Sequence, residues 1–247
     1  MSYEQSKKQF EAGHPVAGKG ASSCLLTLQQ DNRSVTEYSL QFRTLANKTR
    51  WNAVVQVACF QQDLNPRIQA KQAYQDDVTL DPDTAHPKLR VDEDGKSVSG
   101  VNKNLPVEPN KKRFEDNLCV LAKEGFISGK HYWQVEVRDK TAWYIGVGKE
   151  DKDTKEVFTP EEGYWILLYS SPDKFCATTA PETHLPVALT PQKVGVFMDY
   201  ERGHISFYNV DERSHIYTFT SSFKQKLFPF FGTCLRCKHP LVISPVE

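Results

Sequence analysis

The sequence predicts an all-β sandwich or barrel over residues 76–247, preceded by a small all-α segment over residues 1–75. Two observations carry the all-β prediction: apolar and polar side chains alternate with a period of two, and short polar stretches separate the alternating runs. A third observation is that apolar residues before residue 76 have helical spacing, which places the boundary between the two parts near that residue. The stretch 76–82 is the expected junction.

The clearest strand lies in residues 126–137, FISGKHYWQVEV. Trp133 and Val135 alternate there with polar residues, which is typical of a strand with one buried face. Another alternating run, 143–147, follows across a tight turn predicted at 139–140.

A hairpin is predicted in residues 194–209, where alternating runs flank the polar stretch 201–204. Gly203 can adopt the positive φ that such a turn requires. Several short strands joined by polar turns favour an all-β architecture.

Before residue 76 the sequence predicts helices. Residues 35–45 carry one apolar stripe, and Ser34 with Glu37 forms a capping box at its start. Residues 51–60 suggest a second helix, and 65–66 begins a third with asparagine before proline.

Composition narrows the class of partner. Lys and Arg total 31 and Asp and Glu total 31, so the formal net charge is zero. No global field therefore attracts nucleic acid or an anionic membrane. No run approaches the length of a membrane helix, and the first residues lack the apolar stretch of a secretory signal. We expect a cytoplasmic protein that binds neither nucleic acid nor membrane.

The cysteines are scattered, and in a reducing compartment they are expected to be free thiols. Cys234 and Cys237, with His239 nearby, suggest zinc, but a structural site needs four ligands and no second pair lies at a suitable distance. The phosphate-loop spacing and the serine-nucleophile motif are also missing. We therefore expect no metal, no cofactor and no enzymatic activity.

The C-terminal part resembles the PRY–SPRY domain over residues 76–246. The motifs occur in family order and spacing: LDPDTAHPKL (80–89), FISGKHYWQVEV, WYIGV (143–147), GYW (163–165), VGVFMDYERGHISFYN (194–209) and LFPFF (227–231). The form is that of tripartite-motif ubiquitin ligases and fish immune receptors. The resemblance implies two antiparallel sheets packed face to face, with a protein ligand bound by loops at one end. The expected core residues are Trp133, Trp143, Val196, Phe207 and Phe230.

Three segments are candidate partner-binding loops in this resemblance. Aromatic and arginine side chains dominate interface hot spots, which favours Phe175 in segment 169–185 and Arg236 in segment 233–239. The third segment, 102–114, carries a basic run. The predicted contact residues are Lys174, Phe175, Thr178, His184, Leu235, Arg236, Lys111 and Arg113. Two alternatives stay open: Phe175 packs beneath its own loop, and the basic run is an ordinary solvated surface.

Residues 29–70 resemble the C-terminal capsid lobe of retrotransposon Gag proteins of the Ty3/gypsy type. SVTEY, QFRTLA, CFQQDL and NPRI carry the resemblance, which covers about residues 10–75. Asp31 stands where a glycine is common, and neither a full N-terminal lobe nor a zinc knuckle accompanies the segment. Assembly into a shell is therefore not expected. Weak self-association through residues 1–75, or a helical relic without activity, remains open.

Two functions follow as hypotheses. The first is a non-catalytic protein-recognition module in innate immunity or beside a ubiquitin ligase, with avidity if the helical part dimerises. The second is a retroelement-derived factor that joins or disrupts Gag assemblies.

Overall fold

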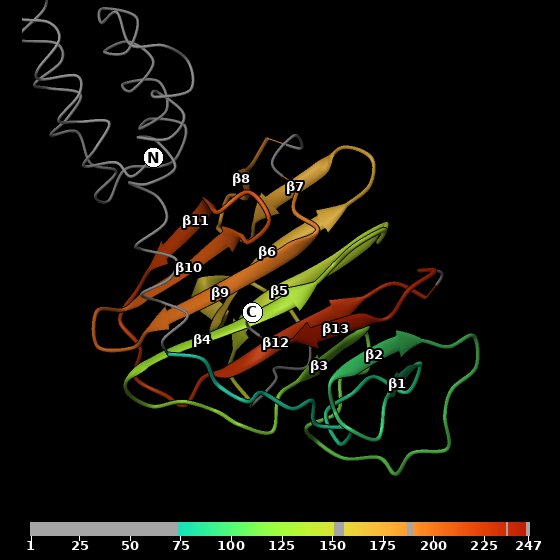
Figure 1. Ribbon diagram of the computed structural model, residues 1–247. Coiled ribbons are helices and arrows are strands. Elements are labelled where there is room, and N and C mark those ends of the chain that lie inside the picture. Colours follow the sequence, from blue (N-terminus) through green and yellow to red (C-terminus); the bar gives the residue numbers. More distant parts are fainter. Residues whose placement is uncertain (1–73, 151–155, 187–189, 236, 246–247) are drawn as a thin grey trace, which may run out of the picture. The chain divides into compact units, whose positions relative to one another are not determined.

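The computed structural model describes residues 74–150, 156–186, 190–235 and 237–245. The helices predicted for residues 1–75 lie outside this part of the chain. The described residues form a sandwich of two antiparallel sheets, which confirms the all-β prediction and selects the sandwich over the barrel (Figure 1).

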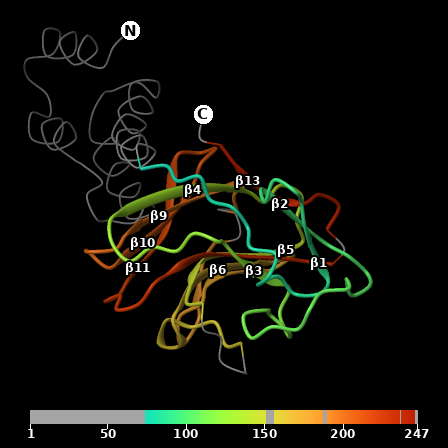
Figure 2. The same ribbon diagram turned by 90° about the horizontal axis from the view of Figure 1, so that it is seen from below.

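The sandwich contains one sheet of seven strands and one of six. The spatial order of the seven-stranded sheet is β1 (Leu89–Val91), β2 (Ser97–Gly100), β13 (Leu241–Ser244), β4 (Lys130–Glu136), β9 (Lys193–Asp199), β10 (His204–Asn209) and β11 (Ser214–Thr220). The order of the six-stranded sheet is β3 (Cys119–Leu121), β12 (Phe228–Thr233), β5 (Ala142–Gly148), β6 (Tyr164–Ser170), β7 (Lys174–Ala177) and β8 (Thr183–His184). A 3₁₀ turn, η1 (Pro160–Glu162), precedes β6. Figure 2 shows the two sheets as stacked layers.

The main core lies between the sheets. Trp133 and Val135 of β4 pair with Val196 and Val194 of β9, and all four side chains are 0–1% exposed. Because side chains alternate along a strand, these residues share the face that meets the second sheet. Burying each such side chain contributes roughly 1.5–3 kcal/mol. Four of the predicted core residues are confirmed in the main core: Trp133, Trp143, Val196 and Phe207.

Both predicted turns are present. Asp139, with φ of 56°, lies in the turn between β4 and β5. The hairpin of β9 and β10 closes with His204 opposite Asp199, and Gly203 has φ of 68°. A tight turn at 201–204 therefore joins the two strands as the sequence predicts.

The stretch 76–82, where the sandwich is predicted to begin, packs into the sandwich. Val78 and Leu80 are fully buried in the main core, and Leu80 forms a bridge with Ala122. The Asp76 backbone N–H donates to the carbonyl of Tyr132 at 2.9 Å. These contacts make the stretch part of the fold and not a linker.

A second hydrophobic cluster covers the outer face of the six-stranded sheet. Phe231 of β12 points into the main core, so its neighbour Phe230 points the opposite way. The Phe230 ring lies 5.6 Å from Phe114, 5.0 Å from Phe158 and 5.8 Å from Tyr164, between ring centroids. Phe230 is buried as predicted, but in this outer cluster and not between the sheets.

Glu156 joins the two long loops that bring Phe114 and Phe158 onto this face. Its carboxylate accepts backbone N–H groups from Glu115 and Asn117 at 2.7 Å and from Asp116 at 3.3 Å. The Asn117 side-chain amide donates a further hydrogen bond at 3.0 Å. Burial raises the pKa of Glu156, but these hydrogen bonds outweigh burial and hold the pKa below its ordinary value.

Replacing Glu156 with glutamine is expected to destabilise the domain by about 1–3 kcal/mol at neutral pH, because the charge-assisted hydrogen bonds to part-buried backbone amides lose their charge and one of the two acceptor oxygens. A carboxylate with a lowered folded-state pKa stabilises above its unfolded pKa, and this stabilisation is lost as pH falls through the folded pKa. The difference between wild type and Glu156→Gln should therefore shrink in acid. Urea unfolding at pH 7 and pH 3 measures it.

Glu161→Gln is the matched control, since Glu161 is exposed in η1 of the same loop. Its substitution should change stability little at either pH. A Glu156→Gln effect that stays equal at pH 7 and pH 3 would contradict the role assigned to the carboxylate.

Candidate functional site

Three connections meet at one end of the sandwich: residues 137–141 between β4 and β5, 171–173 between β6 and β7, and 234–240 between β12 and β13. The first and third cross from one sheet to the other. We call these three connections the disulfide end. The Ser171 N–H donates to the carbonyl of Thr141 at 2.8 Å, which ties the first two connections together.

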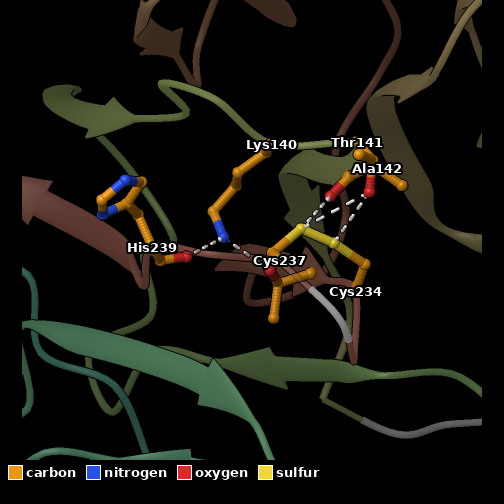
Figure 3. The surroundings of a disulfide bond; sticks show 7 residues. Lys140, Thr141, Ala142, Cys234, Cys237 and His239 are labelled. Carbon is orange, nitrogen blue, oxygen red and sulfur yellow. Dashed lines mark hydrogen bonds between the residues drawn. A yellow bond between two sulfur atoms is a disulfide. The ribbon is translucent and has the colours of Figure 1, made fainter.

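The connector 234–240 contains a disulfide between Cys234 and Cys237, whose Cα atoms are 5.5 Å apart. The prediction that these two cysteines are free thiols is wrong. β12 ends before these two cysteines and the chain turns at Leu235, which brings the two sulfur atoms together. The Thr141 hydroxyl lies 3.4 Å from the Cys234 sulfur and 3.8 Å from the Cys237 sulfur (Figure 3).

The other described cysteines follow the prediction. Cys119 and Cys176 are free thiols and are fully buried. Burial raises the pKa of both thiols, that of Cys176 to about 11. Cys24 and Cys59 lie outside the described residues.

Lys140 fixes both ends of the connector. Its ammonium group donates to the Thr233 hydroxyl at 2.8 Å and to the carbonyl of His239 at 2.9 Å (Figure 3). The residue is 6% exposed, and burial lowers the pKa of Lys140 to about 8. Sequence reasoning missed this residue, since a lysine in a polar turn ordinarily extends into solvent. A lysine beside a tight turn gives no signal that its side chain folds inward.

Phe175 lies in β7 and not in a loop. Its side chain is 1% exposed and faces the main core, with ring centroids 5.8 Å from Trp143 and 6.4 Å from Tyr169. The register that pairs Tyr169 with Phe175 places both on the inward side of β6 and β7. The prediction of Phe175 as a partner contact is corrected: it packs beneath its own segment, the alternative left open above.

Two other predicted contacts are structural. The Thr178 hydroxyl is buried and donates to the carbonyl of Ile166 at 3.1 Å. The Arg113 guanidinium is buried and donates to the carbonyls of Pro82 and Ala85 at 2.9 and 2.6 Å. These groups hold the chain and present little surface to a partner.

The remaining predicted residues are at least partly accessible. Lys174 begins β7 at the disulfide end and forms an ion pair with Glu182 at 2.8 Å. Leu235 is half-buried in the connector, whereas His184 and Lys111 are exposed on β8 and on the loop before β3. The structure thus brings Lys174 and Leu235 to one end. Arg236 lies outside the described residues.

The described part of the chain lacks two kinds of feature. No set of three or more His, Cys, Asp and Glu side chains is grouped there as a metal site would require. None of its helices has the length and apolar character needed to cross a membrane.

Comparison with protein families divides the chain into three matches. The SPRY domain matches residues 130–238, and the SPRY-associated domain PRY matches residues 78–126. The C-terminal capsid-like domain of PEG10/RTL1 matches residues 21–92, which confirms the capsid resemblance. The capsid-like and PRY matches overlap over 78–92, and the structure assigns those residues to the sandwich.

Curated relatives share the C-terminal part. Butyrophilin subfamily 1 member A1 of Bos taurus is 49% identical over 176 residues, covering 69% of this chain and 33% of that protein. The erythroid membrane-associated protein of Homo sapiens is 46% identical over 160 residues, covering 64% of this chain and 34% of that protein. Nuclear factor 7, ovary, of Xenopus laevis is 40% identical over 160 residues, covering 64% of this chain and 26% of that protein. The chain therefore spans about a third or less of these relatives' length.

Solved structures share the fold. The TRIM65 PSpry domain has a TM-score of 0.62 at 21% identity, covering 72% of this chain and 98% of that one. The stonustoxin structure has a TM-score of 0.60 at 24% identity, covering 69% of this chain and 29% of that one. These likenesses concern the arrangement of the sheets.

Proposed function

We infer, from the chain's membership of the PRY–SPRY domain family, that it is a non-catalytic protein-recognition module. Such domains bind protein ligands, and we propose that this one binds its ligand through the disulfide end. Function then resides in the connections and not in strands β4, β9 and β10, whose apolar residues build the core.

This proposal rests on the hydrogen bonds that hold the three connections of the disulfide end in place. Thr141 contacts both the connector and the turn before β7, and Lys140 fixes the connector at two points. Side chains on a rigid support lose little further freedom when a partner binds, so their contacts convert efficiently into affinity. Leu235 supplies an apolar contact and Lys174 a charge at the rim.

The cellular setting belongs to the same proposal. The relatives include butyrophilin and nuclear factor 7, and tripartite-motif proteins carry domains of this form. We propose that the chain recognises a target in innate immunity or for a ubiquitin ligase, in the cytoplasm. Residues 1–75 form the helical part and residues 76–247 the recognition domain in this proposal, and Lys111, His184 and Arg236 remain predicted contacts.

Substitutions at the two ends of the sandwich test the binding site. Leu235→Ala should weaken binding about tenfold or more to the protein captured by the wild-type chain, because central apolar contacts carry most of the affinity. Lys174→Glu should also weaken this binding, because it reverses a charge at the rim and slows association. Purified chain and partner, measured by calorimetry, give the two dissociation constants.

Matched controls lie at the opposite end. Ile127 is 65% exposed before β4, and Lys130 is exposed at the start of β4, where it pairs with the buried carboxylate of Asp199 at 3.8 Å. Ile127→Ala and Lys130→Glu should leave binding unchanged. If these variants weaken binding and the first pair does not, the site lies at the other end and the assignment fails.

The capsid-like match supports a second candidate function. In this proposal residues 1–75 enter a retroelement capsid assembly, and the sandwich is carried along or recruits a partner. Light scattering of the full chain, alone and mixed with a related capsid protein, tests it. Mixed particles would support the proposal, whereas a monomeric chain that never associates with the capsid protein would exclude it.

A further inference from the structure

The disulfide end contains a cysteine pair that differs in accessibility from the other described cysteines. Cys234 and Cys237 are half-buried beside an exposed Thr141. Cys119 and Cys176 are fully buried. Thiol–disulfide exchange requires access for the attacking thiolate, so the pair in the connector is the one at which exchange is possible among the described cysteines.

The disulfide contributes little to holding the fold. Its two cysteines are three positions apart, and a disulfide that closes so short a loop removes little freedom from the unfolded chain. The strands on either side, β12 and β13, are held by their own sheets. Opening this bond therefore leaves the sandwich intact.

Lys140 confines any change to the connector. Its hydrogen bonds reach Thr233, just before Cys234, and His239, just after Cys237. These two contacts do not involve the sulfur atoms, so they persist when the disulfide opens. Leu235, which lies between the two cysteines in the sequence, is therefore the described residue whose freedom increases.

We propose that Cys234–Cys237 is a reversible thiol–disulfide exchange site for low-mass thiols of the glutathione class, and that its redox state sets the conformation of the connector. Disulfides in reducing compartments are ordinarily transient and regulatory, which suits an accessible bond that the fold does not need.

The exchange balances as a two-electron reduction. A glutathione thiolate attacks the Cys237 sulfur, the bond between the two cysteine sulfurs breaks, and Cys234 leaves as a thiolate. A second glutathione thiolate attacks the glutathione sulfur of this mixed disulfide and releases Cys237. Two glutathione molecules become one oxidised glutathione, and their two thiol protons end on Cys234 and Cys237.

Thr141 determines which sulfur leaves. Its hydroxyl is closer to Cys234, at 3.4 Å, than to Cys237, at 3.8 Å. A hydroxyl that donates to the developing Cys234 thiolate lowers its energy, and a more stable leaving thiolate departs faster. In the disulfide-bonded structure the Cys237 sulfur lies 3.9 Å from the carbonyl of Ala142, which is placed to accept the hydrogen of the Cys237 thiol once the bond opens.

The full chain carrying Cys24→Ser and Cys59→Ser is the protein to test, because these changes leave four cysteines to follow. The chain is equilibrated in buffers of increasing reduced-to-oxidised glutathione ratio, alkylated under native conditions, and analysed by peptide mass. We expect Cys234 and Cys237 to become alkylated together as the ratio rises, and to be protected again when oxidised glutathione is restored. Cys119 and Cys176 should stay unmodified throughout.

Two results would overturn the proposal. If the bond resists glutathione in the native chain and opens only in denaturant, it is a fixed structural crosslink. If both cysteines are alkylated at every ratio, the chain holds a stable dithiol.

Thr141→Val tests the assigned chemistry, because it removes the hydroxyl and keeps the side-chain shape. We expect glutathione to open the bond about tenfold more slowly in this variant. Thr220→Val, at an exposed position at the end of β11, is the matched control and should leave the rate unchanged. Equal rates in the two variants would contradict the leaving-group assignment.

The effect of the redox state on partner affinity rests on the proposed function, because Leu235 lies between the two cysteines. The alkylation experiment involves no partner, so its failure overturns the exchange site alone. Unchanged binding by Leu235→Ala overturns the binding site alone.

Discussion

Replacing Phe175 with alanine is expected to lower the free energy of unfolding by about 3–5 kcal/mol. The side chain is 1% exposed and packs edge-on against Trp143 and Tyr169 in the main core. Truncation removes buried apolar surface and leaves a cavity that the two rigid sheets cannot close. Thermal unfolding should shift down by about 6–20 °C for a domain of this size.

Lys174→Ala is the matched control for Phe175→Ala, because the adjacent side chain points away from the core. Lys174 forms a surface ion pair with Glu182, and such pairs contribute at most about 1 kcal/mol. A Phe175→Ala variant that is as stable as Lys174→Ala would contradict the placement of the ring in the core. Any binding loss in Phe175→Ala must be compared at equal folded fraction.

Gly203→Ala is expected to destabilise the domain by about 2–5 kcal/mol. The residue has φ of 68°, which costs an L-residue with a Cβ about 1–2 kcal/mol. An added Cβ would also collide with the carbonyl oxygen of Ser221, whose N–H donates to the carbonyl of Gly203. Relieving that collision displaces the turn from Ser221, at a further cost of about 1–3 kcal/mol. Chemical denaturation of the purified variant measures the total.

Gly129→Ala separates the two causes. Gly129 has φ of 87°, but an added Cβ there would meet only the side chain of His131, at 3.3 Å and without the severe overlap found at Gly203. This variant should therefore show the backbone cost without the collision and lose less stability than Gly203→Ala. Equal losses in the two variants would show that the contact with Ser221 costs nothing.

Strand periodicity predicted the fold because burial on one face is a strong local signal. The runs containing Trp133, Trp143 and Val196 form strands, and Gly203 closes the hairpin as predicted. Periodicity does not say which of two faces a strand buries when both are apolar. In β12 the adjacent Phe230 and Phe231 are both fully buried, in different clusters, and only the three-dimensional arrangement separates them.

The site was harder to predict, because its features depend on neighbours distant in sequence. Segment 169–185 contains small polar residues that obscure strand β7, so the sequence pattern predicts a loop at Phe175. Arg113 and Lys140 are charged but buried, because each donates hydrogen bonds to carbonyl or hydroxyl oxygens. Those acceptors belong to segments distant in the sequence. The Cys234–Cys237 bond depends on a turn that local alternation does not reveal.

Hydrogen exchange of the full chain, free and bound to the protein it captures from native cell extract, tests the central claim most directly. We expect slowed exchange at the amides of 137–141, 171–173 and the connector 234–240 in the complex. The turn at 127–129 at the opposite end should exchange equally in both states. Protection confined to that opposite turn, with the disulfide end unchanged, would contradict the claim that this end of the sandwich recognises the partner.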